Sequence, residues 1–200
     1  MPIRQVQAFF RDRFKAMLAS AVRHHPLGFL YMSEQIAEGT HLRYHFWPED
    51  WLMPSLEQGK EDHDHSYRLT SIIVAGELRH QTFEAAHDAN GTHEIFEVCY
   101  YSGDSALVPT GQVVRVACSG DQTYSAGECY TLSPGVIHRA TPIKLPTATI
   151  VVTVDAMNMG RPRVLAEVGD AIAASSFHRG GLTASEIEKV SAELVRCLPA

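Results

Sequence analysis

The chain has 200 residues, of which 45% are hydrophobic and 20% are charged, and this length and composition are typical of a soluble globular protein with a substantial core. Its formal net charge is −6 and its Lys and Arg residues are scattered, which argues against a nucleic-acid-binding surface. The sequence shows neither an apolar run long enough to cross a membrane nor a signal-peptide pattern at its N-terminus, so we expect neither a membrane span nor secretion.

The first predicted element is a helix over residues 3–22. Its apolar side chains recur with a helical period, at Ile3, Val6, Phe9, Phe10, Phe14, Met17, Leu18 and Val22. We expect His24 and His25 to lie in the last turn, where they complement the helix dipole, and Pro26 to end the segment. A second, short helix is predicted over residues 33–38.

Residues 41–47 alternate as a strand does, with Arg43, His45 and Trp47 on one face together with His41. Two interpretations of that face remain open. Its polar side chains either point to solvent, or Arg43 or His45 reaches the mouth of a cavity beside the histidines that follow. The stretch between Trp47 and Asp62 is predicted as a loop that could act as a lid.

Two histidines one residue apart, His63 and His65, open the next segment. Residues i and i+2 of a strand point to the same face, so both imidazoles can be directed at one metal ion. Residues 72–74 then indicate a buried strand, and Gly76 the turn after it. A His-x-His pair alone is a weak signal, because many such pairs are simply solvated.

The remainder of the chain is predicted as short strands followed by one helix. Residues 77–84 and 92–101 are expected to pair around a hairpin turn at Asn90-Gly91. Further strands are predicted at residues 112–118, 128–132, 136–141 and 147–154, a pattern that favours a jelly-roll barrel. Thr183 and Glu186 form a capping box at the start of the last helix, whose buried stripe is Ile187, Val190, Leu194 and Leu198.

Two stretches resemble the signatures of the cupin superfamily. Gly127, Gly135 and His138 keep the spacing of the second signature, with its proline displaced to Pro134; His63, His65 and Gly76 match the first. The glutamate of that first signature falls here on Leu69 or Thr70, neither of which ligates a metal well. The resemblance implies a mainly β fold, a cupin jelly-roll β-barrel with an N-terminal and a C-terminal helix, and a metal held by His63, His65 and His138.

On this resemblance we expect residues 1–200 to form a single cupin domain. It would comprise a helical N-terminal arm over about residues 1–38, the barrel over about 40–156, and a C-terminal extension and helix over about 157–200. Barrels of this superfamily often pair through edge strands, so a homodimer is expected.

Three neutral imidazoles would leave a divalent metal with its full positive charge and with open positions. Such a site favours an anionic substrate that binds the metal directly, such as a thiolate, enolate or catecholate, with O2 as a co-substrate. Imidazole suits several metals; we expect Fe(II) first, with Ni, Mn or Zn as alternatives.

Within the superfamily the chain resembles cysteine dioxygenase and related thiol dioxygenases, through Trp47, His63-Asp64-His65, His138-Arg139 and the strand at 147–154. The Ser-x-His-x-Tyr triad of that family is absent, and only a hydroxyl remains, at Thr149. Its carboxylate-binding arginine has no clear match, so Arg43, Arg68 and Arg139 are candidates by residue type. By strand alternation Arg68 and Arg139 should point away from the ligands.

Three functions remain open. The first is a non-heme iron dioxygenase that acts on a small chelating anion, most simply a thiol. The second is a metal-dependent isomerase or lyase, for which Tyr67, His80 and Tyr130 are the candidate acids or bases. The third is a cupin that binds a ligand without turnover. The four cysteines form no CxxC pair, which indicates reduced thiols and a cytoplasmic location.

Overall fold

The structure is a computed structural model that describes residues 2–49, 60–101, 104–157, 159–169 and 176–198. Within this part of the chain two helices and eleven strands occur in the order α1 (Ile3–Ala16), β1 (Arg23–His25), β2 (Phe29–Ala37), β3 (Thr40–Trp47), β4 (Asp62–His63), β5 (Tyr67–His87), β6 (His93–Tyr101), β7 (Asp104–Ser125), β8 (Cys129–Leu132), β9 (Ile137–Asp155), β10 (Arg163–Glu167), β11 (Ser176–His178) and α2 (Ala184–Cys197). None of the helices described is long and apolar enough to cross a membrane.

The strands form a barrel because their pairing closes into a ring. β9 pairs with β4 on one side and with β5 on the other; the ring continues from β4 through β10, β6 and β7 back to β5. All these pairs are antiparallel, and β9 follows β5 from residue 155 to residue 137. β3 also pairs with β9 and carries β2 and β1 outward from the ring. The predicted fold class, a mainly β jelly-roll barrel with a helix near each end of the chain, is confirmed.

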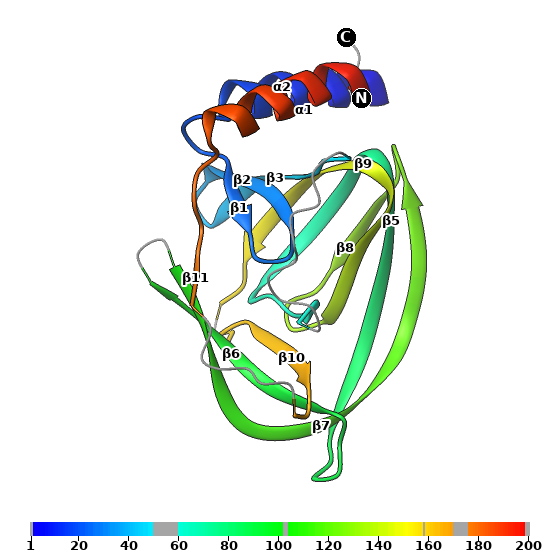
Figure 1. The fold of residues 1–200 in the computed structure, drawn as a ribbon. Helices are drawn as coiled ribbons and strands as arrows, with labels where there is room; N and C mark the ends of the chain where they lie inside the picture. Colours follow the sequence, from blue (N-terminus) through cyan, green and yellow to red (C-terminus); the bar gives the residue numbers. More distant parts are fainter. Residues whose placement is uncertain (1, 50–59, 102–103, 158, 170–175, 199–200) are drawn as a thin grey trace.

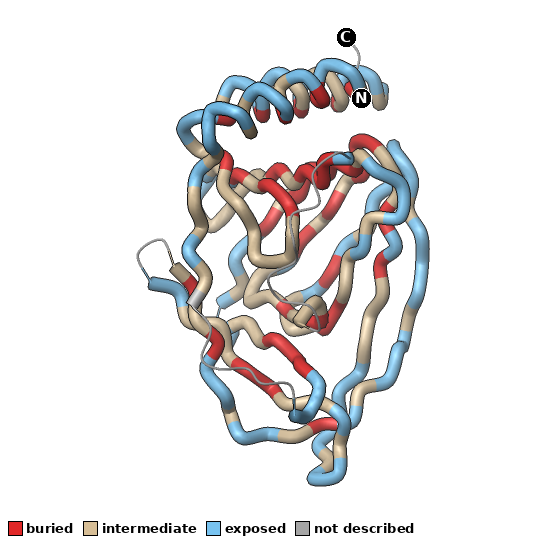
Figure 2. The backbone as a smooth tube through the Cα atoms, viewed as in Figure 1, coloured by how far each residue is buried: buried red, intermediate tan, exposed pale blue. Residues whose placement is uncertain are grey.

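The two helices lie side by side across one end of the strands (Figure 1). α1 buries Val6, Phe10 and Phe14, and α2 buries Val190 and Leu194, with Leu198 following at the C-cap. These side chains join buried residues of β2, β3 and β9 in the largest apolar cluster, which lies between the helix layer and the barrel (Figure 2). The predicted capping box is confirmed, since the Thr183 hydroxyl accepts the Glu186 N–H and the Glu186 carboxylate accepts the Thr183 N–H.

Two predictions for the N-terminal region were wrong. Residues 33–38 do not form a helix: 33–37 belong to β2, where they pair with residues 40–43 of β3. His24 and His25 do not cap α1, because that helix ends at Ala16 and both histidines lie in β1, opposite Leu30 and Phe29. In both places cross-strand pairing outweighed the local signal.

Gly76 was expected to end a strand, but β5 continues through it to His87. Its φ is +73°, and a Cβ at this position would overlap the carbonyl oxygens of Lys144 and Pro146 and the hydroxyl of Thr147 on β9. The register between β5 and β9 shifts on both sides of this residue. The glycine therefore bends the strand where the partner backbone passes close, and does not end it. Residues 136–141 and 147–154, expected as two strands, likewise lie almost entirely in the single strand β9.

The hairpin predicted at Asn90-Gly91 was also wrong in its pairing. The chain does turn there, but β5 and β6 do not pair with each other. His87 of β5 and His93 of β6 both lie opposite Val114, on the two sides of β7. The turn therefore carries the chain across β7. Residues 163–167, expected within the C-terminal extension, form β10, the strand that joins β4 to β6 in the ring.

Candidate metal centre and cavity

The structure brings His63, His65 and His138 together beside the pairing of β4 with β9. His63 of β4 and His138 of β9 are directly opposite residues of neighbouring strands. His65 follows in the irregular segment before β5, so the continuous strand expected at 63–76 is interrupted here. The ring centroids are 4.5 Å apart for His63 and His138, 4.8 Å for His63 and His65, and 5.1 Å for His65 and His138. The three candidate ligand atoms lie within 4.8 Å of one another.

Two of these imidazoles have their tautomer set by the backbone. Nδ1–H of His63 donates to the carbonyl of Glu61 at 2.7 Å, and Nδ1–H of His138 donates to the carbonyl of Val136 at 3.1 Å. A carbonyl only accepts, so each Nε2 keeps its lone pair. Burial lowers the pKa of His63, His65 and His138. Three neutral nitrogen donors facing one another are a set that fits a divalent metal ion.

Two buried carboxylates hold the segment that carries His63 and His65. Asp62 forms two hydrogen bonds with the Arg139 guanidinium, at 2.7 and 2.8 Å. Asp64 accepts from the backbone N–H and the Nε of Arg163, both at 2.6 Å. Both carboxylates are therefore occupied by arginines of β9 and β10, and they fix the segment against its two neighbouring strands.

In the part of the chain that the structure describes, the candidate ligand group is made of these three histidines alone. Leu69 and Thr70, where the first cupin signature would place its glutamate, make other contacts here. Leu69 is buried in an apolar cluster, and the Thr70 hydroxyl lies 3.0 Å from that of Thr131.

The histidines line a cavity of about 460 Å³. Its walls are largely apolar, from Phe29, Trp47, Leu69, Leu78 and Val151, and its polar lining includes Arg43, Arg139, Arg179, His25, His45 and Glu61. Among the described lining residues Glu61 is the only acidic one, against three arginines. The cavity therefore combines neutral nitrogen donors with excess positive charge. The lid predicted at residues 48–62 falls mostly on residues 50–59, outside the described part.

Of the candidate acids and bases, Tyr67 and Tyr130 line the cavity and His80 does not. Tyr67 lines the cavity and stacks on His65, with ring centroids 4.6 Å apart; burial raises the pKa of its phenol to about 12. Tyr130 also lines the cavity, and burial raises its pKa to about 12. His80 is buried behind His138 and packs on Tyr130, with centroids 4.2 Å apart, and burial lowers its pKa to about 4. Thr149 lines the cavity with its buried hydroxyl unpartnered among the described residues.

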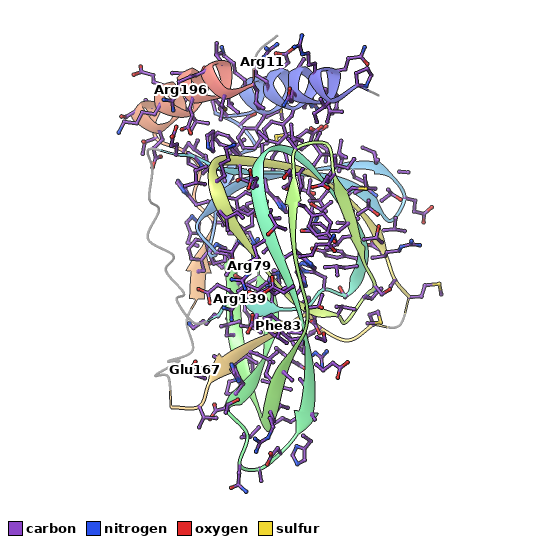
Figure 3. All side chains as sticks on the ribbon, turned by 90° about the vertical axis from the view of Figure 1, so that its right-hand side faces the viewer. Arg11, Arg79, Phe83, Arg139, Glu167 and Arg196 are labelled. Atoms are coloured by element: carbon purple, nitrogen blue, oxygen red, sulfur yellow. The ribbon has the colours of Figure 1, made fainter. Side chains whose placement is uncertain are left out.

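Of the three candidate arginines, Arg43 and Arg139 line the cavity and Arg68 does not. Arg43 lines the cavity, with its guanidinium 4.5 Å above the Tyr67 ring. Arg139, expected to point away from the ligands, also lines the cavity, but its guanidinium is occupied by Asp62. Figure 3 shows Arg139 near Phe83, and its guanidinium lies 5.6 Å from the centre of that ring. Arg68 is exposed on β5 and does not belong to the cavity lining, as strand alternation predicted.

Sequence reasoning missed several polar residues of the cavity, among them His25 and Arg179. His25 was assigned to a helix end, but the β1–β2 hairpin turns it onto Phe29, with centroids 4.1 Å apart. Arg179 follows β11, which pairs with residues 104–106 of β7 and with neither β5 nor β9. No local pattern distinguishes it from a surface arginine; only the long-range pairing of β11 could have placed it.

Searches with the sequence found no matching family model and no matching curated protein. A search with the structure found remote similarities. A variant of oxalate decarboxylase from Bacillus subtilis has a TM-score of 0.41 at 12% identity, covering 68% of this chain and 28% of that one. Oxalate decarboxylase of Lactobacillus farciminis, in a formate complex, gives 0.39 at 13% identity, covering 68% and 31%. DMSP lyase DddQ from Ruegeria pomeroyi DSS-3 gives 0.46 at 12% identity, covering 81% and 75%. The chain thus spans less than a third of the decarboxylases.

Proposed function

We propose that this protein is a mononuclear metal enzyme that acts on a small anionic substrate, and that Fe(II)-dependent dioxygenation, most simply of a thiol, is its reaction. The observation that carries the proposal is the convergence of His63, His65 and His138 on a cavity whose other charged lining is mainly arginine. Iron, when bound there, would supply a Lewis-acidic centre and redox chemistry toward dioxygen.

The charge of the site supports an anionic substrate. The three imidazoles are neutral because burial lowers their pKa, so the protein contributes no negative charge through its ligands. A divalent ion in this site would keep its full charge, and the guanidinium of Arg43 adds to it. An anion entering the cavity would therefore be attracted by both.

The remaining cavity residues would hold and orient that anion. Tyr67 is held by stacking on His65 and by the guanidinium of Arg43, which lies over its ring, and its raised pKa keeps the phenol protonated as a hydrogen-bond donor. The Thr149 hydroxyl offers a further polar contact. Leu69, Leu78 and Val151 line the same space with apolar side chains.

One observation favours a second candidate, a metal-dependent lyase or isomerase. Tyr67 stacks on His65 with ring centroids 4.6 Å apart, so a phenol lies beside one of the candidate metal ligands. A positioned tyrosine can act as a general acid or base in a reaction that needs no oxidant. This candidate predicts turnover without oxygen.

The two candidates are separated by oxygen uptake. The Fe(II)-loaded protein is tested with small thiols, enediols, β-diketones and catechols, and product formation is followed with and without oxygen. Uptake coupled to product, abolished by His138→Ala and retained in His178→Ala, supports the dioxygenase; His178 is exposed and serves as the matched control. Oxygen-independent product would replace the dioxygenase by the lyase. If the iron-loaded protein forms no product from any compound under either condition, a binding function without turnover replaces both.

A further inference from the structure

A second, smaller cavity of about 80 Å³ borders two of the candidate metal ligands. It shares five lining residues with the larger cavity of about 460 Å³, namely His25, Leu27, His63, His65 and Arg179. Much of its remaining lining comes from β6, β7 and β10, three strands that contribute nothing to the larger cavity. The ligand segment is therefore reached from two sides.

An apolar row crosses the sheet and ends beside one of the ligands. Val164 of β10 lies directly opposite His63 of β4. Phe96 of β6 lies opposite Val164, and Val98 follows two residues later on the same face of β6. Leu107 of β7 lies opposite Val98. These four apolar residues belong to one cluster, and three of them, Val98, Leu107 and Val164, line the smaller cavity.

Two polar groups beside this row already have partners within the protein. The Asp64 carboxylate is held by Arg163, and Nδ1–H of His63 donates to the carbonyl of Glu61. Tyr100, which also lines the smaller cavity, is 61% exposed, so the cavity extends to the molecular surface. An apolar surface of this kind is what small cavities in proteins offer to gases such as xenon.

The two cavities differ in the molecules that they can admit. The larger one is lined by Arg43, Arg139 and Arg179, and its volume suits a small anionic molecule. The smaller one has room for only a few atoms. An anion bound in the larger cavity would block the approach to the metal ligands from that side, whereas a diatomic molecule could still pass along the apolar row.

We propose that the smaller cavity binds a small apolar gas molecule, and that it is the path by which dioxygen reaches the metal ligands. Dioxygen is uncharged and apolar, so its transfer from water to an apolar surface is favourable. The arginine-lined cavity instead favours the anion. The role of dioxygen rests on the proposed function; the binding of an apolar gas does not.

Xenon is the probe for gas binding, because it is apolar, inert and small. Methyl NMR spectra of the full-length protein without metal are recorded under increasing xenon pressure. We expect saturable shifts of the methyl signals of Leu107 and Val164, and their loss in Val98→Phe, whose larger side chain fills the cavity. Val116→Phe is the matched control, because Val116 is also a half-buried valine of the ring but lines neither cavity.

Nitric oxide tests the path, because it is a diatomic ligand of Fe(II) and its binding needs no turnover. Its association rate with the Fe(II)-loaded protein is measured by anaerobic stopped flow. The rate should fall at least about threefold in Val98→Phe at unchanged iron content, and it should keep the wild-type value in Val116→Phe.

The two measurements fail separately. Absence of xenon shifts in the wild type, or undiminished shifts in Val98→Phe, would overturn gas binding. A Val98→Phe protein that no longer binds xenon but keeps the wild-type nitric oxide rate would overturn the path, and so would one that loses its iron, because Val98 would then support the metal site. If the wild type holds no iron, the proposed function fails, and the xenon shifts alone decide whether the smaller cavity binds an apolar gas.

A smaller substitution covers the case in which Val98→Phe does not fold. Val98→Ile adds one methylene to the same wall of the cavity. Weaker xenon binding together with slower nitric oxide association supports the proposal, and wild-type values of both overturn it.

Discussion

Arg163 binds the carboxylate of Asp64 twice, through its backbone N–H and its Nε, both at 2.6 Å. Asp64 lies between the two histidines of the His-x-His pair, and its side chain is only 4% exposed. The ion pair therefore fixes the backbone that carries His63 and His65 against β10. The spacing of His63 and His65 allows both imidazoles to bind one metal ion, and Asp64 holds their segment in place.

The first prediction follows from that role. Asp64→Asn keeps the size of the side chain but removes its charge, so the bond to Arg163 weakens and the two histidines lose their fixed position. We expect metal affinity to fall about 10- to 100-fold, as it does for residues that position ligands. Competition with a chelator measures the affinity. Asp121→Asn, in the exposed pair with Arg79, is the matched control; equal affinity in both variants would show that Asp64 does not position the ligands.

Tyr67→Phe distinguishes the two candidate reactions. The variant removes the phenolic proton and keeps the ring that stacks on His65. If Tyr67 is the acid or base of a lyase, kcat should fall by about 10² to 10⁴. If it only orients the substrate of a dioxygenase, we expect a loss below about tenfold, mainly in KM. A large fall in kcat for oxygen-dependent turnover would contradict the orienting role.

The cavity-lining histidines His25 and His45 predict an acid-sensitive fold. Burial lowers the pKa of His45 to about 3 and that of His25 well below its usual 6.5. Between these values and pH 6.5 the unfolded chain binds more protons than the folded one, so stability is full above pH 6.5 and declines as the pH falls below it. Urea unfolding of the metal-free protein from about pH 7.5 to 5 should show this decline, with a shallower slope in His45→Gln than in His178→Gln. A flat profile would mean that folding does not lower the pKa of these histidines.

Gly76→Ala tests the bend in β5. Gly76 and Gly111 share a φ of +73°, but a Cβ at Gly76 would overlap the β9 backbone, whereas one at Gly111 would meet nothing within 4 Å. Both alanines carry the cost of the left-handed backbone, about 1–2 kcal/mol, and only Gly76→Ala adds the overlap. The free energy of unfolding should therefore fall more for Gly76→Ala. Equal losses would show that close packing of β9 does not require this glycine.

Several helices and strands of this fold can be predicted from local sequence patterns. The helical period that begins at residue 3, the capping box at Thr183 and the alternation of residues 41–47 each depend on neighbours in sequence, and each appears in the structure. The two histidine motifs could be joined because their spacings match a known pair of signatures. That resemblance groups His63 with His138, although the two residues lie far apart in the sequence.

The rest depends on pairing between distant segments. Residues 33–37 form a strand because β3 lies beside them, and Asn90-Gly91 joins strands on opposite sides of β7. The backbone of β9 occupies the space that a Cβ at position 76 would need, so the glycine lets β5 bend there and continue. Arg179 reaches the cavity through a segment whose local sequence carries no signal of it. A short pattern cannot specify which distant strand will be its neighbour.

The central claim is that His63, His65 and His138 hold one metal ion. Its most direct test is the metal content of protein loaded anaerobically with Fe(II) and desalted, measured by plasma mass spectrometry. We predict about one iron per chain for the wild type and His178→Ala, and a sharp loss for His63→Ala, His65→Ala and His138→Ala, each shown to be folded by circular dichroism. Full occupancy in the three single variants, or none in the wild type, would contradict the account.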